Sequence, residues 1–308
     1  MARYASIDIG TNSVLLLVAE KQPDGTFTPV VERAEITRLG RGVDKTRTLS
    51  AEGMEDTLRA VTAFAEEARA AGAQEIAVSA TSAARDASNG REFLDGARTR
   101  AGVTVEIISG ELEAQLSSAS AYQDFARKAP ERPLVVLDIG GGSTEFIYGQ
   151  RDGQVAFRHS FDVGSVRLTE RFVTGHPLPS ADRERIRQHL RETFAALPPP
   201  PERSQLVGVA GTVTTLYSVL HRIDPYDSAR VHGAVLPRSE LSALVSRLCD
   251  LPLEERRQLP GLQPKRADVI CAGGLILEAS MERLGARECV VSDRGLRWGL
   301  LAHRFGGR

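Results

Sequence analysis

Residues 134–150 read LVVLDIGGGSTEFIYGQ, and residues 4–20 read YASIDIGTNSVLLLVAE. The two stretches align at a shift of 130 residues, with Asp8 on Asp138 and an Asp-Ile-Gly sequence in both. Each is an apolar run, a short polar turn and a second apolar run, which predicts a strand, a tight turn and a strand. Because one copy opens each half of the chain, the repeat predicts a duplicated domain.

The rest of the chain alternates strand patterns with helix patterns, as is typical of α/β proteins. Ser50 and Ser109 each precede a helix pattern and are expected as N-caps. The sequence therefore predicts two α/β halves. The expected helices cover residues 50–72, 110–128, 183–197, 213–222, 266–284 and 294–304, and the expected strands outside the repeat cover residues 75–80, 103–108, 205–209 and 288–292.

The first turn is a candidate phosphate loop. Gly10 permits backbone angles that other residues avoid, and successive amides in such a turn can point at an anion. Thr11, Asn12 and Ser13 add side-chain donors, and Asp8 can hold a cation or its water. An ordinary hairpin turn uses the same residue types, so on its own this turn is better interpreted as structural.

The second turn contains three consecutive glycines, Gly140–Gly142, followed by Ser143 and Thr144. Glycine loses more conformational freedom on folding than any other residue, so three in a row are costly. That cost is explained where the backbone must pass close to a ligand. The second turn therefore favours a binding role more strongly than the first.

The repeat also reveals an asymmetry, because Glu145 stands where the first copy has Leu15. A carboxylate that replaces an apolar residue just after the turn indicates a function. Together with Asp8 and Asp138, Glu145 would form an all-oxygen site suited to Mg²⁺ or Mn²⁺. A solvent-facing strand residue is the less favoured alternative.

Three further segments carry candidate residues. Gly211 and Thr212 follow strand 205–209, where a helix N-terminus could bind phosphate and where Thr212 could equally cap its own helix. Arg85 could clamp a phosphate bidentately or be a surface arginine. Glu113 lies in the first turn of a helix, as a general base near a phosphate would, although acids there also complement the helix dipole.

Composition narrows the function classes. The 308 residues are 42% hydrophobic with a net charge of −1, so a polyanion would need a local basic patch. Aromatic residues make up only 5%, which argues against a nucleic-acid partner. No run is long enough for a transmembrane helix and the N-terminus lacks a signal-peptide pattern, so we expect a cytoplasmic protein with no membrane partner. The three cysteines are expected to be reduced and buried.

Seven segments, in order along nearly the whole chain, resemble the exopolyphosphatase/guanosine-pentaphosphate phosphohydrolase family of the actin/Hsp70/hexokinase superfamily. The resemblance implies two duplicated ribonuclease-H-like (actin/hexokinase-type) α/β domains with a cleft between them. These would be residues 1–117 and 118–296, with a final helix at about 297–308 packing back on the first. The segments are DIGTNS at 8–13, ATSAARDA at 80–87, EIISGELEA at 106–114, LDIGGGSTEF at 137–146, FDVGSVRLTERF at 161–172, GVAGTVTTL at 208–216 and VSDRGLRWGLL at 291–301.

The resemblance also implies roles for particular residues. A catalytic glutamate in the SGxxEA motif falls on Glu113. Metal or metal-water contacts would come from Asp8, Asp138 and Glu145. Phosphate contacts would fall on Thr11, Asn12, Ser13, Arg85, Gly140, Gly141, Gly142, Ser143, Thr144, Gly211 and Thr212.

Two positions depart from the family pattern. Leu112 stands where many members carry another glutamate, which leaves Glu113 as the matching base. Trp298 stands where relatives usually have an acid. The chain resembles the short members of the family, without the extra C-terminal helical domains of the long ones.

The expected activity is hydrolysis of the terminal phosphate of inorganic polyphosphate by a homodimer that uses Mg²⁺ or Mn²⁺. Guanosine pentaphosphate is the alternative substrate within the same chemistry. Two functions of a different kind also fit the sequence, a superfamily kinase and a sensor of phosphate-rich ligands. Acceptor-dependent ATP turnover would identify the kinase, and tight binding without phosphate release would identify the sensor.

Overall fold

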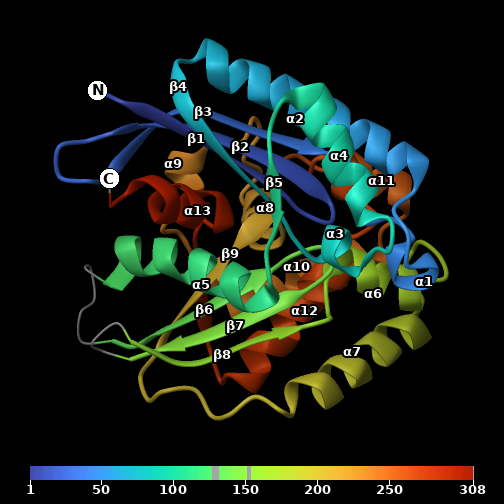
Figure 1. Cartoon of the computed structure of the whole chain (residues 1–308). Coiled ribbons are helices and arrows are strands. Elements are labelled where there is room, and N and C mark those ends of the chain that lie inside the picture. The colour runs from blue at the N-terminus through green and yellow to red at the C-terminus, as the bar shows by residue number, and fades with distance from the viewer. Residues whose placement is uncertain (127–131, 151–153, 308) are drawn as a thin grey trace. The chain divides into compact units, whose positions relative to one another are not determined.

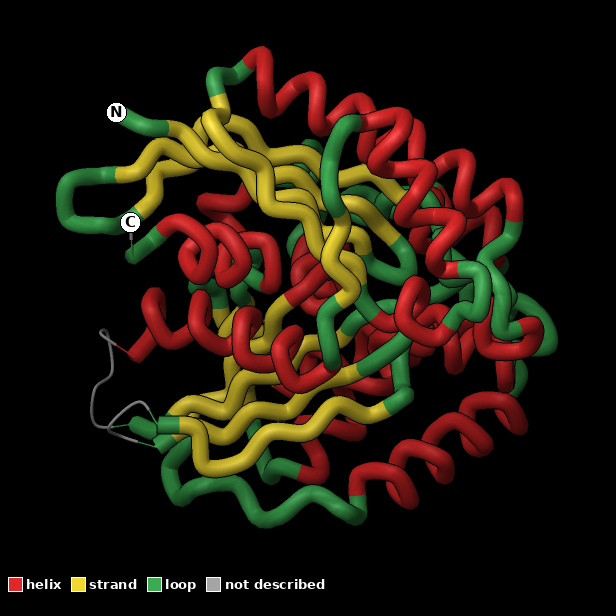
Figure 2. Tube along the Cα trace, viewed as in Figure 1, coloured by secondary structure: helices red, strands yellow, loops and turns green. Residues whose placement is uncertain are grey.

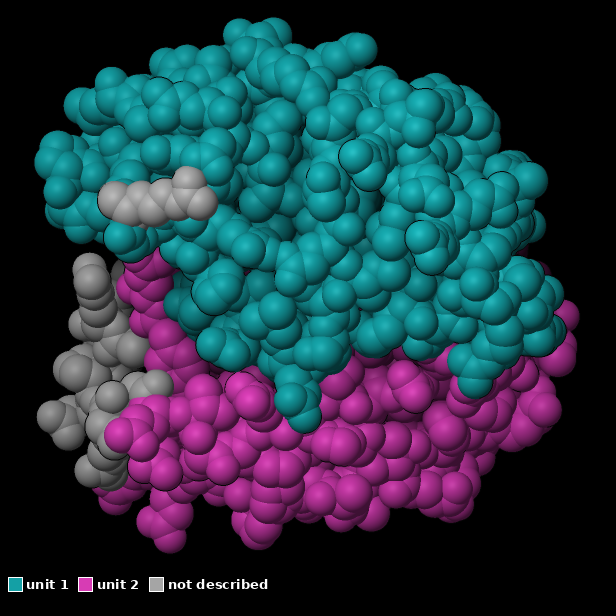
Figure 3. Space-filling view, viewed as in Figure 1, with its two compact units in different colours: residues 1–120, 296–308 teal, residues 121–295 magenta. Residues whose placement is uncertain are grey.

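The structure, a computed structural model, describes residues 1–126, 132–150 and 154–307 (Figure 1). Its strands form two β-sheets, drawn in yellow in Figure 2. The chain divides into two compact units, residues 1–120 with 296–308 and residues 121–295, which Figure 3 colours separately. Each unit contains one of the sheets.

The first unit contains one sheet and the helices packed on it. The elements are β1 (Arg3–Ile9), β2 (Ser13–Lys21), β3 (Phe27–Ile36), α1 (Val43–Thr46), α2 (Ala51–Ala70), β4 (Ala73–Ala80), α3 (Ser82–Asp86), α4 (Gly90–Ala101), β5 (Val105–Ile107), α5 (Gly110–Ala121) and α13 (Leu296–Phe305). The strand order is β3-β2-β1-β4-β5. The pairs β1–β2 and β2–β3 are antiparallel, and the pairs β1–β4 and β4–β5 are parallel.

Both faces of this sheet are covered, as strand β2 shows. Side chains alternate between the faces of a strand. Val14, Leu16 and Val18 accordingly join one buried cluster with side chains of α2 and α4. Leu17 and Ala19 join a second cluster with side chains of α13. The long apolar run after the first turn is therefore explained by burial on both sides.

The second unit contains the other sheet. Its elements are the π-helical turn η1 (Tyr122–Ala126), β6 (Leu134–Ile139), β7 (Thr144–Gly149), β8 (Val155–Phe161), α6 (Ser165–Phe172), α7 (Ser180–Phe194), β9 (Gln205–Val209), α8 (Ala210–Leu220), α9 (Ser228–Val231), β10 (Val235–Pro237), α10 (Arg238–Asp250), α11 (Leu253–Arg257), the 3₁₀ turn η2 (Pro264–Arg266), α12 (Ile270–Arg283) and β11 (Glu288–Val291). The strand order is β10-β11-β9-β6-β7-β8. Strands β6, β7 and β8 pair antiparallel, β6 pairs parallel with β9, and β9 with β11.

The two sheets repeat one topology. If β6, β7, β8, β9 and β11 are matched with β1, β2, β3, β4 and β5, the strand order and every strand direction agree. The antiparallel edge strand β10 is the addition in the second unit. The predicted duplication of an α/β domain is confirmed.

The two hairpins also agree in detail. The N–H of Gly10 donates to the carbonyl of Ser13 at 2.9 Å, and the N–H of Gly140 donates to the carbonyl of Ser143 at 3.0 Å. A shift of 130 residues therefore relates the turns in space as well as in sequence.

The expected helix starts are partly confirmed. The Ser50 hydroxyl accepts from Gly53 N–H at 3.1 Å, and the Ser109 hydroxyl accepts from Leu112 N–H at 3.2 Å, so both serines cap their helices. Helix α5 ends at Ala121 and continues as η1, and the last two residues of the predicted helix, 127–128, lie outside the described residues.

The helix expected at 213–222 begins earlier, at Ala210. Gly211 and Thr212 thus lie in its first turn, and the interpretation of Thr212 as the N-cap of this helix was wrong. The reason is that β9 ends at Val209, which serves as the N-cap residue without a side-chain bond.

Both departures from the family pattern are packing residues in the first unit. Trp298 is buried with Leu17, Leu301 and Phe305, and Leu112 packs against a cluster that contains Ile108. In the described part of the chain, no helix is long and apolar enough to cross a membrane.

Candidate functional site

The first turn, Gly10 to Ser13, has its carbonyl groups tied to the segment that follows β3. The carbonyl of Thr11 accepts from Gly40 N–H at 2.8 Å, and the carbonyl of Asn12 accepts from Thr37 N–H and Arg38 N–H at 3.1 Å each. These bonds turn the peptide oxygens toward residues 37–40. Because these carbonyls are bonded to residues 37–40, the N–H groups of the turn are left for another partner. Such a turn can act as an anion-binding nest.

Close packing around Thr11 fixes this turn. Its hydroxyl shares a 2.7 Å hydrogen bond with the Ser82 hydroxyl at the start of α3. A Cβ atom on Gly40 would lie 2.2 Å from Thr11 Cγ2, so only glycine fits at position 40. Thr11 and Asn12 are both buried. The turn is thus held on two sides, by α3 and by residues 37–40.

Arg85 and Glu113 are brought together in the same unit. Arg85 lies on α3, and its Nη1 donates to the carbonyl of Ile108 at 2.8 Å and lies 3.5 Å from Glu113 Oε2. Glu113 is only 8% exposed. Arg85 is therefore no free surface arginine, and it positions the carboxylate predicted to act as the base.

The two acids at the start of α5 differ in their surroundings. Glu111 is exposed, as expected of a residue that merely complements the helix dipole. Glu113 is turned into the unit, toward Arg85. Complementing a helix dipole requires no burial, so the position of Glu113 needs another explanation.

The three-glycine turn of the second unit has its carbonyls occupied as well. The N–H groups of Ser165 and Val166, at the start of α6, donate to the carbonyls of Gly140 and Gly141 at 3.0 and 2.9 Å. Arg167 Nε donates to the carbonyl of Gly142 at 2.7 Å. All three glycine carbonyls are thereby bound by one helix end.

The N–H groups of Gly141 and Gly142 are left for another partner. Among the described residues, neither donates a backbone hydrogen bond. The backbone of Gly164 passes so close that a Cβ there would lie 2.3 Å from Gly141 O. The consecutive glycines are thus explained in part by this close approach and in part by N–H groups that remain available to a ligand.

Asp138 and Glu145 are cross-strand neighbours on β6 and β7. Residues directly opposite in an antiparallel pair point to the same face of a sheet, with Cβ atoms about 4.5–5.5 Å apart. The Ser160 hydroxyl, from β8, donates to Glu145 Oε1 at 2.7 Å. In the first unit, the residue opposite Asp8 is Leu15, so only the second unit carries a paired carboxylate.

The carboxylates of Asp138 and Glu145 fit a hard divalent cation. Asp138 is 7% exposed and Glu145 is fully buried. Two adjacent buried carboxylates would repel each other without a positive charge between them. Among the described residues no group of three or more His, Cys, Asp or Glu side chains is arranged to hold a metal. Mg²⁺ in proteins is usually held by one or two carboxylates, with water and substrate oxygens completing its shell.

Other predicted phosphate ligands have structural bonds of their own. The Thr212 hydroxyl donates to the carbonyl of Ile139 at 3.1 Å, so it ties α8 to β6 and does not cap α8. The Thr144 hydroxyl donates to the carbonyl of Val163 at 2.5 Å. At these two positions, only the backbone remains to contact a ligand.

Gly211 lies beneath an arginine. A Cβ there would meet Arg266 Nη1 at 2.5 Å. Burial lowers the pKa of the Arg266 guanidinium to about 10, with an opposing contribution from Tyr226. The glycine is thus required for Arg266 to approach the start of α8.

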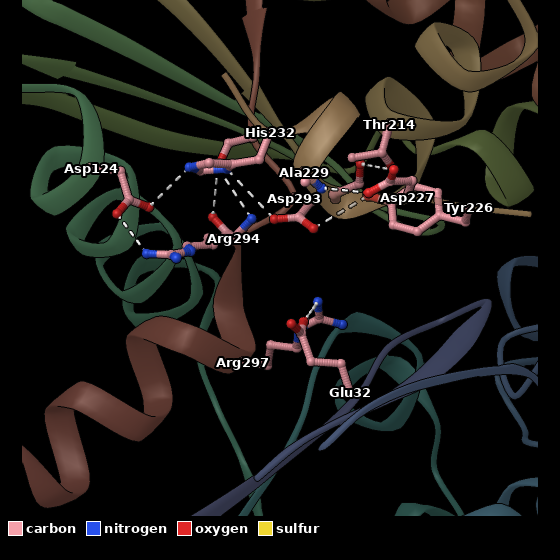
Figure 4. A network of polar contacts seen from close by, with 12 residues as sticks. Glu32, Asp124, Thr214, Tyr226, Asp227, Ala229, His232, Asp293, Arg294 and Arg297 are labelled. Atoms are coloured by element: carbon pink, nitrogen blue, oxygen red, sulfur yellow. Dashed lines mark hydrogen bonds and ion pairs between the residues drawn. The ribbon is translucent and has the colours of Figure 1, made fainter. Parts of the chain in front are cut away.

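A separate polar network, absent from the sequence expectations, joins the first and last segments of the second unit (Figure 4). Asp124 Oδ1 accepts from Arg294 Nη1 at 2.8 Å, and Asp124 Oδ2 lies 3.7 Å from His232 Nε2. The other ring nitrogen of His232 lies 3.5 Å from Asp293 Oδ1. Arg294 and the His232 ring lie against the two acids here, so a structural role accounts for the cluster.

The model of the Ppx/GppA phosphatase family matches residues 17–305. This chain belongs to that family. The Ppx/GppA resemblance predicted from the seven sequence segments is therefore confirmed, and with it the α/β fold built from two sheets.

Individual Ppx/GppA relatives match nearly the whole chain. It is 34% identical to exopolyphosphatase 2 of Mycobacterium tuberculosis, over 97% of this chain and 98% of that protein. The solved structure of an Aquifex aeolicus family member has a TM-score of 0.80 at 32% identity, covering 98% of this chain and 97% of its own. An exopolyphosphatase structure from Cytophaga hutchinsonii has a TM-score of 0.88 at 25% identity, covering 99% and 98%.

Several residues around the two turns escaped the sequence analysis. Gly40 and Ser160 received no role, and Ser82, Gly164 and Arg167 were noted only as parts of family segments. Their signals were weak, because each acts through a partner distant in sequence. The FDVGSVR segment was the one detectable clue, since a Gly-Ser pair before a helix is suited to contact backbone closely.

Proposed function

We propose that this protein is an exopolyphosphatase that removes terminal phosphate from inorganic polyphosphate with the help of a divalent cation. The observation that carries the proposal is the hydrogen bonding of the two turns, Gly10 to Ser13 and Gly140 to Ser143. In both, neighbouring groups bind the carbonyls, with backbone N–H groups at most positions and the Arg167 side chain at Gly142, which leaves N–H groups to bind phosphate oxygens. The name of the Mycobacterium tuberculosis relative supports the choice of substrate.

Each unit is proposed to have candidate phosphate contacts of its own. In the first, they are the N–H groups of the turn and the guanidinium of Arg85. In the second, they are the N–H groups of the glycine turn and of the first turn of α8. Backbone N–H groups held in place before the reaction need no rearrangement as charge develops, which is how fixed dipoles lower a barrier. The proposed set is Thr11, Asn12, Ser13, Arg85, Gly141, Gly142, Ser143, Thr144, Gly211 and Thr212, and the expected Gly140 is left out because its N–H donates to the Ser143 carbonyl.

Asp138 and Glu145 would hold the cation in the second unit, and Asp8 is the corresponding candidate for a metal or metal-water contact in the first unit. Mg²⁺, or Mn²⁺ in its place, would neutralise part of the negative charge on the phosphate oxygens. The Ser160 hydroxyl orients the Glu145 carboxylate for this task, because it donates to one of its two oxygens. Positive charge at this position also removes the repulsion between the two buried acids.

In the reaction, a water oxygen forms a bond to the terminal phosphorus while the bridging P–O bond breaks. Glu113 accepts the proton that the water loses, and the shortened chain leaves with the bridging oxygen. Arg85 keeps the Glu113 carboxylate in place throughout. The products are orthophosphate and a polyphosphate one unit shorter.

The test is phosphate release from long-chain polyphosphate by the purified protein, with Mg²⁺, with Mn²⁺ and with EDTA. Guanosine pentaphosphate and ATP are run as parallel substrates. We expect metal-dependent release from polyphosphate that exceeds release from the other two. Preferential release from guanosine pentaphosphate would move the assignment to the sister activity. No release from any substrate, with polyphosphate still bound, would favour a sensor.

The proposal extends to the state of the protein in the cell. Cys249, Cys271 and Cys289 are free and buried, which suits a reducing cytoplasm. We also propose that the protein is a homodimer and that its two domains are residues 1–117 and 118–296. Light scattering after size-exclusion chromatography tests the homodimer, and limited proteolysis tests the domain boundaries.

A further inference from the structure

Residues 37–49 connect β3 to α2. The first residues of this connection are hydrogen-bonded to the first turn, Gly10 to Ser13. Thr37 and Arg38 donate their N–H groups to the carbonyl of Asn12, and Gly40 donates to that of Thr11. The start of this connection is therefore fixed against the backbone of a proposed phosphate-binding turn.

The far end of the same connection is fixed beside α3, the helix that carries Arg85. Ser88 N–H donates to the carbonyl of Arg47 at 2.8 Å. The Asn89 side chain bonds both backbone groups of Leu49, at 2.7 and 3.0 Å. Helix α1, in the middle of the connection, lies next to α3 (Figure 1). The connection thus runs from the first turn to the Arg85 segment.

The connection is strongly basic. It contains Arg38, Arg41, Lys45 and Arg47, and Asp44 is its one acidic residue. Arg41, Lys45 and Arg47 are exposed. Within the part of the chain that the structure describes, none of these three exposed side chains forms an ion pair. In a chain of net charge −1, this is a local concentration of positive charge.

Two of these arginines have an unusual backbone. Arg38 has φ 58° and Arg47 has φ 57°, in the left-handed region that favours glycine. Arg38 is held there by its bond to Asn12, and Arg47 by the bond that its carbonyl accepts from Ser88. Such conformations concentrate at ligand-binding segments, where surrounding bonds impose them.

We propose that residues 37–49 form a polyanion-binding loop that holds the phosphate units of the substrate beyond the one being hydrolysed. The proposal rests on the proposed function, because it takes the first turn and Arg85 as the place of the terminal phosphate. An ordinary solvated basic loop would need neither of its two anchored ends nor its proximity to both of these groups.

A linear polyphosphate carries about one negative charge per internal unit, so its tail gains from several separated cations. The exposed side chains of Arg41 and Lys45 provide such charges without a fixed geometry. The attraction would be long-ranged, sensitive to salt and stronger for longer chains. The loop therefore sets a preference for long over short polyphosphate.

The test is equilibrium binding of long-chain polyphosphate and of tripolyphosphate in EDTA, which prevents turnover. The variant is Arg41→Gln/Lys45→Gln. The control is Arg59→Gln/Arg98→Gln, which removes the same charge from α2 and α4 of the same unit. In the loop variant, we expect the ratio of the affinity for long-chain polyphosphate to the affinity for tripolyphosphate to fall about tenfold. We also expect its binding to depend less on salt, with both properties kept by the control.

An unchanged ratio in the loop variant would overturn the proposal, and so would an equal fall in the control. Absence of polyphosphate binding by the parent protein would overturn it as well. Because binding is measured without hydrolysis, failure of the proposed reaction stays distinguishable. If the parent protein binds polyphosphate through the loop but releases no phosphate, the proposed reaction is refuted. The assignment of residues 37–49 as a polyanion-binding loop would still hold.

Discussion

The Arg85 guanidinium lies 3.5 Å from the Glu113 carboxylate, although 28 residues separate the two in sequence. Arg85 is itself held by the carbonyl of Ile108. The carboxylate proposed as the general base is therefore positioned by a residue that is anchored to backbone. This arrangement leads to a direct test of the roles of the two acids in α5.

Glu113→Gln is expected to lower turnover of polyphosphate about 10²–10⁴-fold, because the amide keeps the shape of the side chain but cannot accept the proton. Equilibrium binding of polyphosphate should stay close to normal. Glu111→Gln, at the exposed acid of the same helical turn, is the matched control and should keep its turnover. A turnover of Glu113→Gln within a few-fold of the parent would rule out this base.

Ser160→Ala is expected to raise the Mg²⁺ concentration needed for half-maximal phosphate release about 10–100-fold, because Ser160 orients Glu145. Magnesium titrations of phosphate release measure this shift. Ser204→Ala, at a half-buried serine of the same unit, is the control. Identical titrations for the parent and Ser160→Ala would argue against Glu145 as a metal ligand.

Gly164→Ala should displace the three-glycine turn, since the new Cβ would lie 2.3 Å from Gly141 O and 2.5 Å from Gly142 N. We expect a loss of about 1–3 kcal/mol in the free energy of unfolding and weaker phosphate binding. Gly175→Ala is the matched control, because a Cβ at Gly175 meets no atom within 4 Å. Denaturant unfolding and polyphosphate titrations measure both effects, and equal behaviour of the two variants would contradict this account.

His189 should make stability depend on pH. Burial, with a smaller contribution from Arg171, lowers the pKa of its imidazole below the usual 6.5, and Glu192 opposes this shift. The unfolded chain then binds the proton more readily than the folded one. The contribution of His189 to the free energy of unfolding is complete above about pH 6.5. It falls as the pH drops toward the lower pKa that His189 has in the folded protein.

His189→Gln is accordingly expected to flatten the fall in the free energy of unfolding below about pH 6.5, with little change at pH 8. Urea unfolding at a series of pH values measures it. His303→Gln, at an exposed histidine of α13, serves as the control. An acid-side slope that is the same in both variants would show that His189 contributes nothing.

Much of this protein could be predicted from its sequence, because the decisive information is local. An Asp-Ile-Gly hairpin repeated at a shift of 130 residues predicts two copies of one domain, and the paired strand orders confirm it. The exchange of Leu15 for Glu145 predicted a functional asymmetry. Strand pairing within a hairpin converts that difference into a carboxylate opposite Asp138 in the second copy alone.

The supporting contacts depended on the tertiary structure. That Ser160 meets Glu145 is a matter of register between β7 and β8, and a one-residue slip would turn each side chain to the other face. That Arg167 meets Gly142 depends on how α6 packs against the turn. The sequence determined the repeated hairpins and the residue types at their turns, because backbone preferences act over a few residues. Which groups hold those turns in place was decided by the folded chain, since hydrogen bonds between distant segments form only where packing brings them together.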